Sequence, residues 1–131
     1  MAKGYDENQQ QKNRLNFLGK DLVRRSRSKC ELCEADGVKL TIFEVPPESE
    51  SVTADRCLFI CETCREQIEK PKLMAADHWR CLNNAVWSDI PAVQVISARI
   101  LKRLSKEHWA EDLLEEAYFG EEVEAWIAAA E

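Results

Sequence analysis

The chain has 131 residues, of which 45% are hydrophobic and 32% charged, and its formal net charge is −6. This length suits one domain, or one small domain with an extension. Because no apolar run reaches about 18 residues, the sequence predicts no membrane span and no membrane partner. The polar N-terminus MAKGYDENQQQKNR lacks the apolar core of a secretory signal. We therefore expect a cytoplasmic protein in a reducing compartment.

The N-terminal part of the chain is basic and the rest is acidic. Residues 12–29 carry seven bases against one acid, a balance of +6, whereas residues 30–131 carry a balance of −11. Residues 1–11 are polar with a run of Gln, which predicts a disordered tail. A basic arm on an acidic body can contact phosphate or pack on its own body. The body as a whole should repel nucleic acid.

The basic segment 12–29 has the pattern of an amphipathic helix. Its apolar residues fall on one helical stripe with the bases on the other faces, at Leu15, Leu18, Leu22 and Val23. Seven bases without interleaved aromatic residues are a weak signal for nucleic-acid binding. We favour a helix packed on the following module, and nucleic-acid contact stays the alternative.

Four of the six cysteines form two CxxC pairs, Cys30/Cys33 and Cys61/Cys64. In a reducing compartment such pairs favour a metal ion over disulfides. A thioredoxin-like redox pair would need a βαβ context, which the order of elements does not supply. Four thiolates about 2.3 Å from one Zn²⁺ make a closed tetrahedral site that serves structure. The sequence therefore predicts a structural Zn²⁺ ion bound by these four cysteines.

Residues 30–72 are predicted to form the zinc finger module. A strand over 39–45, a polar loop and a returning strand over 56–60 connect the two CxxC pairs. A short helix over 62–69 follows the second pair. A second pair that opens a helix is typical of a treble clef, whereas a zinc ribbon would place it on another hairpin. We favour the treble clef and leave the zinc ribbon open.

Residues 73–131 are predicted to form a helical unit of three helices. Ser88 or Asp89 is expected to cap the first helix, which has Pro91 in its first turn and runs to about residue 105. The second covers about 109–119 with Gly120 as its stop, and the third about 121–130. The four tryptophans of this half are expected in its core. The fold class is thus α+β: a treble-clef or zinc-ribbon-like finger with a short β-hairpin, followed by a three-helix unit.

Several stretches together resemble the PhnA-like family, whose members are labelled alkylphosphonate utilisation proteins. They are Cys30-Glu-Leu-Cys33, Phe43-Glu-Val-Pro-Pro47, Cys61-Glu-Thr-Cys64, His78-Trp-Arg-Cys-Leu82 and Trp87-Ser-Asp-Ile-Pro-Ala-Val-Gln-Val95. The CxxC pairs are generic, and the segment HWRCLN followed by WS-x-x-PAVQV is specific. The resemblance implies a zinc-binding N-terminal module and says more about the fold than about the function.

The residues argue against an enzyme. A phosphonate-cleaving metallohydrolase needs a cluster of His and Asp ligands, and the chain has two histidines, His78 and His108. An HNH-type nuclease needs a His on the first strand of its hairpin, where this chain has Phe43-Glu-Val-Pro-Pro47. For His78 we favour packing or helix capping over a role at the zinc site or contact with a ligand. For Cys57 and Cys81 we favour buried apolar surroundings.

The predicted function is that of a small cytosolic zinc-binding protein with an interaction or regulatory role. Its partner is expected to be a protein, and nucleic acid is possible through the basic arm 12–29. The alternatives are a degenerate or active HNH-like metal-dependent nuclease and a nucleic-acid-binding zinc finger.

Overall fold

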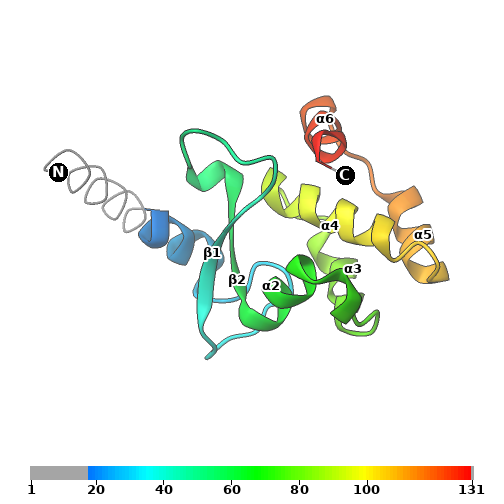
Figure 1. Cartoon of the computed structure of the whole chain (residues 1–131), viewed down its shortest axis with the longest axis horizontal. Helices are drawn as coiled ribbons and strands as arrows, with labels where there is room; N and C mark the ends of the chain where they lie inside the picture. Colours follow the sequence, from blue (N-terminus) through cyan, green and yellow to red (C-terminus); the bar gives the residue numbers. More distant parts are fainter. Residues whose placement is uncertain (1–17, 131) are drawn as a thin grey trace, which may run out of the picture.

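A two-stranded antiparallel sheet and several helices make up the protein (Figure 1). The computed structural model describes residues 18–130. Strand β1 (Leu40–Glu44) pairs with β2 (Cys57–Cys61), with Leu40 opposite Cys61 and Glu44 opposite Cys57. A helix over 18–26 precedes the hairpin, and α2 (Glu62–Glu69) continues directly from β2. The predicted α+β class is confirmed; the tail 1–11 and the first part of the basic helix lie outside the described residues.

The C-terminal half packs around one central helix. Helix α4 (Pro91–Arg103) is buried over most of its length, and α5 (His108–Glu116) and α6 (Glu121–Ala129) pack against it. Helix α3 (Leu82–Ala85) and strand β2 also contact α4, which places α4 between the hairpin and the two last helices (Figure 1). Short 3₁₀ helices at Ala54–Arg56, Pro71–Leu73 and His78–Cys81 complete the described chain. None of its helices is long and apolar enough to cross a bilayer.

One hydrophobic core joins the finger to the helices. Its buried residues come from the first CxxC turn, both strands, α2 and each of the helices α3, α4, α5 and α6. Trp79 is fully buried and donates its indole N–H to Gln67 Oε1 on α2 at 2.8 Å, and the same oxygen accepts the Ala75 N–H. This amide therefore ties the segment before α3 to the finger helix.

Three expectations about the helical half are wrong in detail. Neither Ser88 nor Asp89 caps α4: its N-cap residue is Ile90, and Ser88 Oγ accepts the Ile90 N–H instead. The second helix ends at Glu116, and Gly120 serves as the N-cap residue of α6. Of the four tryptophans, Trp87 is 53% exposed and lies in the turn that follows the short α3.

An ion pair closes the outer edge of β2. Arg25 binds both carboxylate oxygens of Glu31, at 2.8 and 2.7 Å, and also donates to the carbonyl oxygens of Ala54 and Cys57. The Glu31 side chain is only 3% exposed. Its backbone N–H donates to Phe59 O on β2, and its Oε1 accepts the Phe59 N–H. The N-terminal helix, the first CxxC turn and the sheet are therefore fixed by one buried carboxylate.

Replacing Arg25 by Met should destabilise the folded chain by about 3 kcal/mol, because it leaves the buried Glu31 carboxylate without its cation. Urea unfolding of the metal-loaded protein measures this loss. Arg24→Met, at the exposed neighbouring position, is the matched control and should change the free energy of unfolding by no more than about 0.5 kcal/mol. Equal stability of both variants would contradict a structural role for the Arg25–Glu31 pair.

Candidate metal centre

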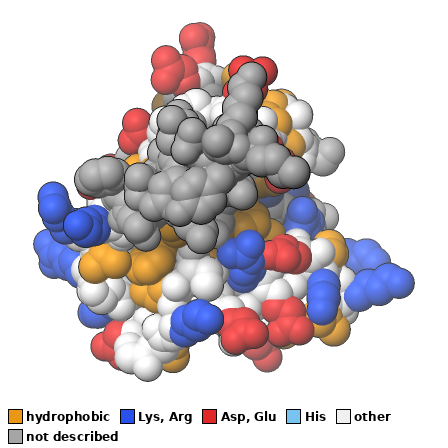
Figure 2. Space-filling model, turned by 60° about the vertical axis from the view of Figure 1, so that its left-hand side comes forward, with side chains coloured by type: hydrophobic (Ala, Val, Ile, Leu, Met, Phe, Trp, Pro, Cys, Tyr) orange, Lys and Arg blue, Asp and Glu red, His pale blue; other side chains and the backbone are white. Residues whose placement is uncertain are grey.

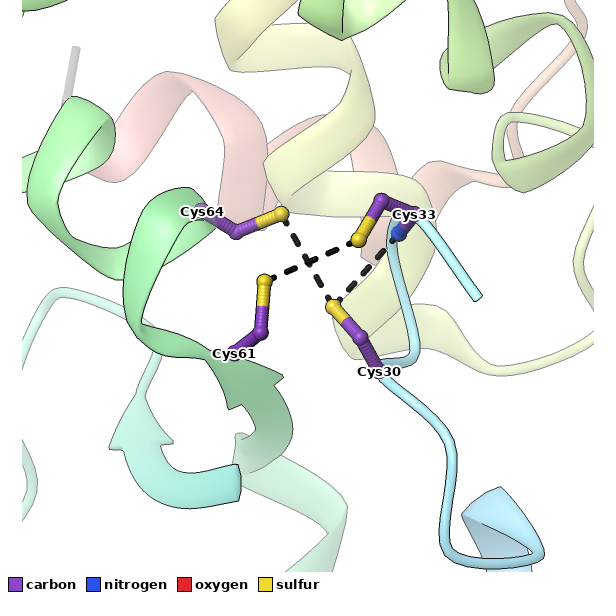
Figure 3. Close-up of side chains that lie close together, drawn as sticks. All are labelled: Cys30, Cys33, Cys61 and Cys64. Atoms are coloured by element: carbon purple, nitrogen blue, oxygen red, sulfur yellow. Dashed lines mark hydrogen bonds between the residues drawn. The ribbon is translucent and has the colours of Figure 1, made fainter. Parts of the chain in front are cut away.

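Four cysteine thiols converge on one point between the first CxxC turn and the junction of β2 with α2 (Figure 3). All four Sγ atoms, of Cys30, Cys33, Cys61 and Cys64, lie within 4.8 Å of one another. Cys30 Sγ is 3.7 Å from Cys64 Sγ, and Cys33 Sγ is 3.6 Å from Cys61 Sγ, so each close pair joins the two CxxC turns. Thiols far apart in the sequence are thus within reach of a single metal ion. Within residues 18–130 no other group of three or more His, Cys, Asp or Glu side chains has this arrangement.

The first CxxC turn is shaped by its backbone. The Cys30 N–H donates to Ala35 O and the Glu34 N–H to Cys30 O, both at 2.9 Å, which folds the segment into a tight turn. Glu34 adopts a φ of 64°, which reverses the chain after the second cysteine. The Cys33 N–H points at Cys30 Sγ at 3.5 Å. Both thiols of this turn therefore face the second CxxC pair.

The second CxxC turn joins a strand to a helix. Cys61 is the last residue of β2 and the N-cap residue of α2, and Cys64 lies in the first turn of that helix. The positive end of a helix and its free N–H groups stabilise thiolates. A CxxC turn followed by a hairpin, with a second CxxC that opens a helix, is the order of a treble clef, the arrangement that we favoured from the sequence.

Without a cation the four thiols do not all ionise near neutral pH. A hydrogen bond with Cys64 lowers the pKa of Cys30 to about 4, whereas burial raises the pKa of Cys33 to about 12. The pKa of Cys64 is raised, first by its hydrogen bond to Cys30 and then by burial. A bound metal ion supplies the positive charge that lets all four release their protons, so metal binding is coupled to proton release.

His78 contacts this centre, a position that sequence reasoning did not favour. Its Nε2 lies 3.2 Å from Cys64 Sγ, and burial lowers the pKa of the imidazole, which keeps the ring neutral near pH 7. A neutral ring with its proton on Nε2 donates to a Cys64 thiolate. The sequence signal was the HWRC segment itself, but only the docking of the 3₁₀ helix His78–Cys81 against α2 shows which sulfur the ring contacts.

The two remaining cysteines stay outside the cluster of four. Cys57 is fully buried on β2, and burial raises its pKa to about 11. Cys81 is half-buried and packs against the core, and burial likewise raises its pKa to about 11. Both thiols are therefore protonated near neutral pH, as expected for buried apolar cysteines. His108, the other histidine, has a side chain that is 88% exposed, and its Nε2 lies 3.5 Å from Asp112 Oδ2.

Compared with known proteins, the chain matches no family model, no curated protein and no solved structure. The likeness to the PhnA-like family therefore stays a prediction from the sequence. What the structure supplies independently is a metal-binding arrangement of four cysteines in an α+β fold.

Replacing His78 by Phe should speed the release of the bound metal ion to a competing chelator by about tenfold, because the Cys64 thiolate loses its N–H donor. Stopped-flow absorbance with a chromogenic chelator measures the rate. In the Co²⁺-loaded protein, the sulfur-to-metal charge-transfer band should shift as well. His78→Gln can still offer an N–H, so its rate of metal release should lie between those of His78→Phe and the unaltered protein.

His108→Phe, at the exposed histidine, is the matched control and should release its metal at the rate of the unaltered protein. Release from His78→Phe at that same rate, with an unshifted band, would show that the Nε2···Sγ contact does not act on the metal centre.

Proposed function

We propose that the metal ion is Zn²⁺ and that it serves the structure of the protein. The supporting observation is the spacing of the thiols. A tetrahedral site with Zn–S bonds of about 2.3 Å places neighbouring sulfurs about 3.8 Å apart. The two close pairs at 3.7 and 3.6 Å fit this value, whereas a disulfide would need about 2.05 Å. Four thiolates in tetrahedral array suit Zn²⁺ better than oxygen-preferring cations.

The proposed role of the zinc is structural because four protein ligands fill its coordination shell. Catalytic zinc keeps a position open for water or substrate. Three of the four cysteines are buried, and only Cys33 is partly accessible. At the β1 position where an HNH-type nuclease needs a histidine, this chain has Glu44, whose carboxylate accepts hydrogen bonds from the N–H and hydroxyl of Ser49.

We propose that the protein, as a relative of the PhnA-like type, acts through contact with a protein partner. Large apolar side chains stand exposed on the described surface, among them Trp87 and the 90% exposed Tyr118. Exposed aromatic side chains are frequent anchors of protein interfaces. Tyr118 also belongs to the segment 107–131, which has nine acids and no Lys or Arg; such a surface repels nucleic acid and attracts basic partners.

Nucleic-acid contact through the basic arm is the second candidate. Lys20, Arg24, Arg27 and Lys29 are all exposed on or just after the N-terminal helix. On the face that carries this end of the chain, however, Lys and Arg side chains are interrupted by Asp and Glu (Figure 2). A surface of mixed sign holds phosphates less well than a continuous basic one.

The purified chain should contain one Zn²⁺ per molecule, as measured by elemental analysis under reducing conditions. Cys33→Ser should lose the metal and the protection of residues 30–69 from hydrogen exchange, because structural zinc contributes about 10–16 kcal/mol of binding free energy. Cys81→Ser, which alters a thiol outside the cluster, is the matched control and should keep a ratio near one. A metal-free wild-type chain that shows full exchange protection would contradict the proposal.

Duplex DNA should bind weakly or not at all at physiological salt, and added plasmid should stay intact with Mg²⁺ or Mn²⁺ present. The physical reason is the acidic body and the absence of a histidine on the hairpin. Fluorescence anisotropy over a salt series measures the binding, and gel electrophoresis measures cleavage. Sub-micromolar affinity that falls steeply with salt and disappears when the exposed Lys20, Arg24, Arg27 and Lys29 are replaced by Gln would instead favour the nucleic-acid candidate.

A further inference from the structure

A second site lies away from the cysteine cluster, between the finger and the helical half. It is a cavity of about 430 Å³. The N-terminal helix and the 3₁₀ helix Ala54–Arg56 line one side, and the start of α4 and one face of α6 line the other. Its volume falls within the range of about 300–1,000 Å³ typical of small-molecule sites, which prefer such interfaces between structural units.

Arg56 is the cation that this cavity offers to a ligand. Its guanidinium lies over the indole ring of Trp126, 4.7 Å from the centroid, and its Nη2 donates to Pro47 O at 3.1 Å. Among the described residues it has no carboxylate partner, and its buried Nε has no hydrogen-bond partner. The other arginine of the cavity, Arg25, is already neutralised by Glu31. Arg56 is therefore oriented in advance and its charge is unmatched.

Two carboxylates of opposite sign to Arg56 stand at the same cavity. Asp55 precedes Arg56 in the chain, and Glu122 lies in the first turn of α6. Both are exposed, and within residues 18–130 neither forms an ion pair. The cavity thus brings one unmatched cation and two unmatched anions to a single opening.

Between these charges the wall is apolar. Ile90 and Pro91 at the start of α4 face Val123 and the ring of Trp126 on α6. Trp126 cannot swing freely, because its Nε1 donates to Pro46 O at 3.1 Å. A ligand that fills this space needs an apolar part as well as charged ends.

We propose that this cavity binds a free α-amino acid with an apolar side chain, in its zwitterionic form. The ligand carboxylate pairs with Arg56, where the positive end of α4 adds to the attraction. The ammonium group pairs with Asp55 and Glu122, and the side chain packs on Ile90, Val123 and Trp126. A simple anion would leave the two carboxylates unmatched and repelled, and a simple cation would face Arg56. This ligand class goes beyond the metal-dependent role proposed above.

The test is an NMR titration of the isotope-labelled, metal-loaded full chain with L-leucine and L-phenylalanine at millimolar concentration. Two N–H groups report directly on the cavity: Nε of Arg56 and Nε1 of Trp126. Both should shift saturably with at least one of the two amino acids, while the indole signal of Trp79 in the core stays in place. If neither amino acid shifts either reporter signal, the proposal is overturned.

Isocaproate and isopentylamine separate the charges, because each keeps the leucine side chain and only one charged end. Each should bind about tenfold more weakly than L-leucine, since one charged hydrogen-bonded contact is lost. Isocaproate binding as tightly as L-leucine would make this a plain anion site and overturn the assignment of a zwitterion. Isopentylamine binding as tightly would overturn it equally.

Variants assign the contacts. Arg56→Gln should weaken L-leucine binding by about tenfold and Glu122→Gln by about threefold. Arg80→Gln, which removes an arginine stacked on Trp109 instead, and Glu124→Gln on the same helix are the matched controls and should bind as the unaltered protein does. Glu122→Gln alters an exposed side chain, so it remains informative if Arg56→Gln disturbs folding. Unchanged affinity in Glu122→Gln together with loss in Glu124→Gln would place the ligand elsewhere.

Discussion

Two CxxC turns separated by a hairpin must bring four sulfurs within 4.8 Å of one another, and most of the described structure depends on this constraint. A lone two-stranded hairpin is marginally stable in water. Here one CxxC pair precedes β1 and the other begins at the last residue of β2. The strand pairing places Cys61 opposite the start of β1, and α2 turns Cys64 back toward Cys30. Burial raises the pKa of Cys33, and a hydrogen bond with Cys30 raises the pKa of Cys64. A bound cation would let these thiols release their protons.

The helical half supports this centre directly, which explains why the two halves share a core. His78 places its Nε2 3.2 Å from Cys64 Sγ, and the adjacent Trp79 is fixed by the Gln67 amide on α2. On the other side Arg99, buried in α4, donates to Pro46 O after β1 and to backbone carbonyls at the end of α6. A single buried guanidinium thereby connects the hairpin, the central helix and the last helix. The cysteine cluster is accordingly supported by both halves of the fold and not by the finger alone.

The sequence predicts the local features well because their causes are local. The spacing of the CxxC pairs predicts a four-cysteine cluster, and the runs of strand-forming residues locate both strands to within about one residue at each end. Helix α2 spans the predicted residues 62–69. What the sequence does not predict is decided by packing between distant segments. The contact of His78 with Cys64 depends on how the short helices between residues 71 and 85 dock. The Arg25–Glu31 closure of β2 depends instead on how the N-terminal helix packs against the first CxxC turn and β2.

Strand β2 joins the metal centre to the cavity, so the two sites are not mechanically independent. Arg56, which lines the cavity, comes immediately before β2, and Cys61, one of the clustered thiols, ends it. A five-residue strand spans only about 17 Å, and its partner β1 leads directly into the Pro46–Pro47 segment that holds both Arg56 and Trp126. Whatever orders the cysteine end of this hairpin therefore also orders the cavity end. By thermodynamic linkage the relation is mutual. If the proposed amino acid binds only the ordered cavity, it raises the affinity for the metal by the same factor by which the bound metal raises the affinity for the amino acid.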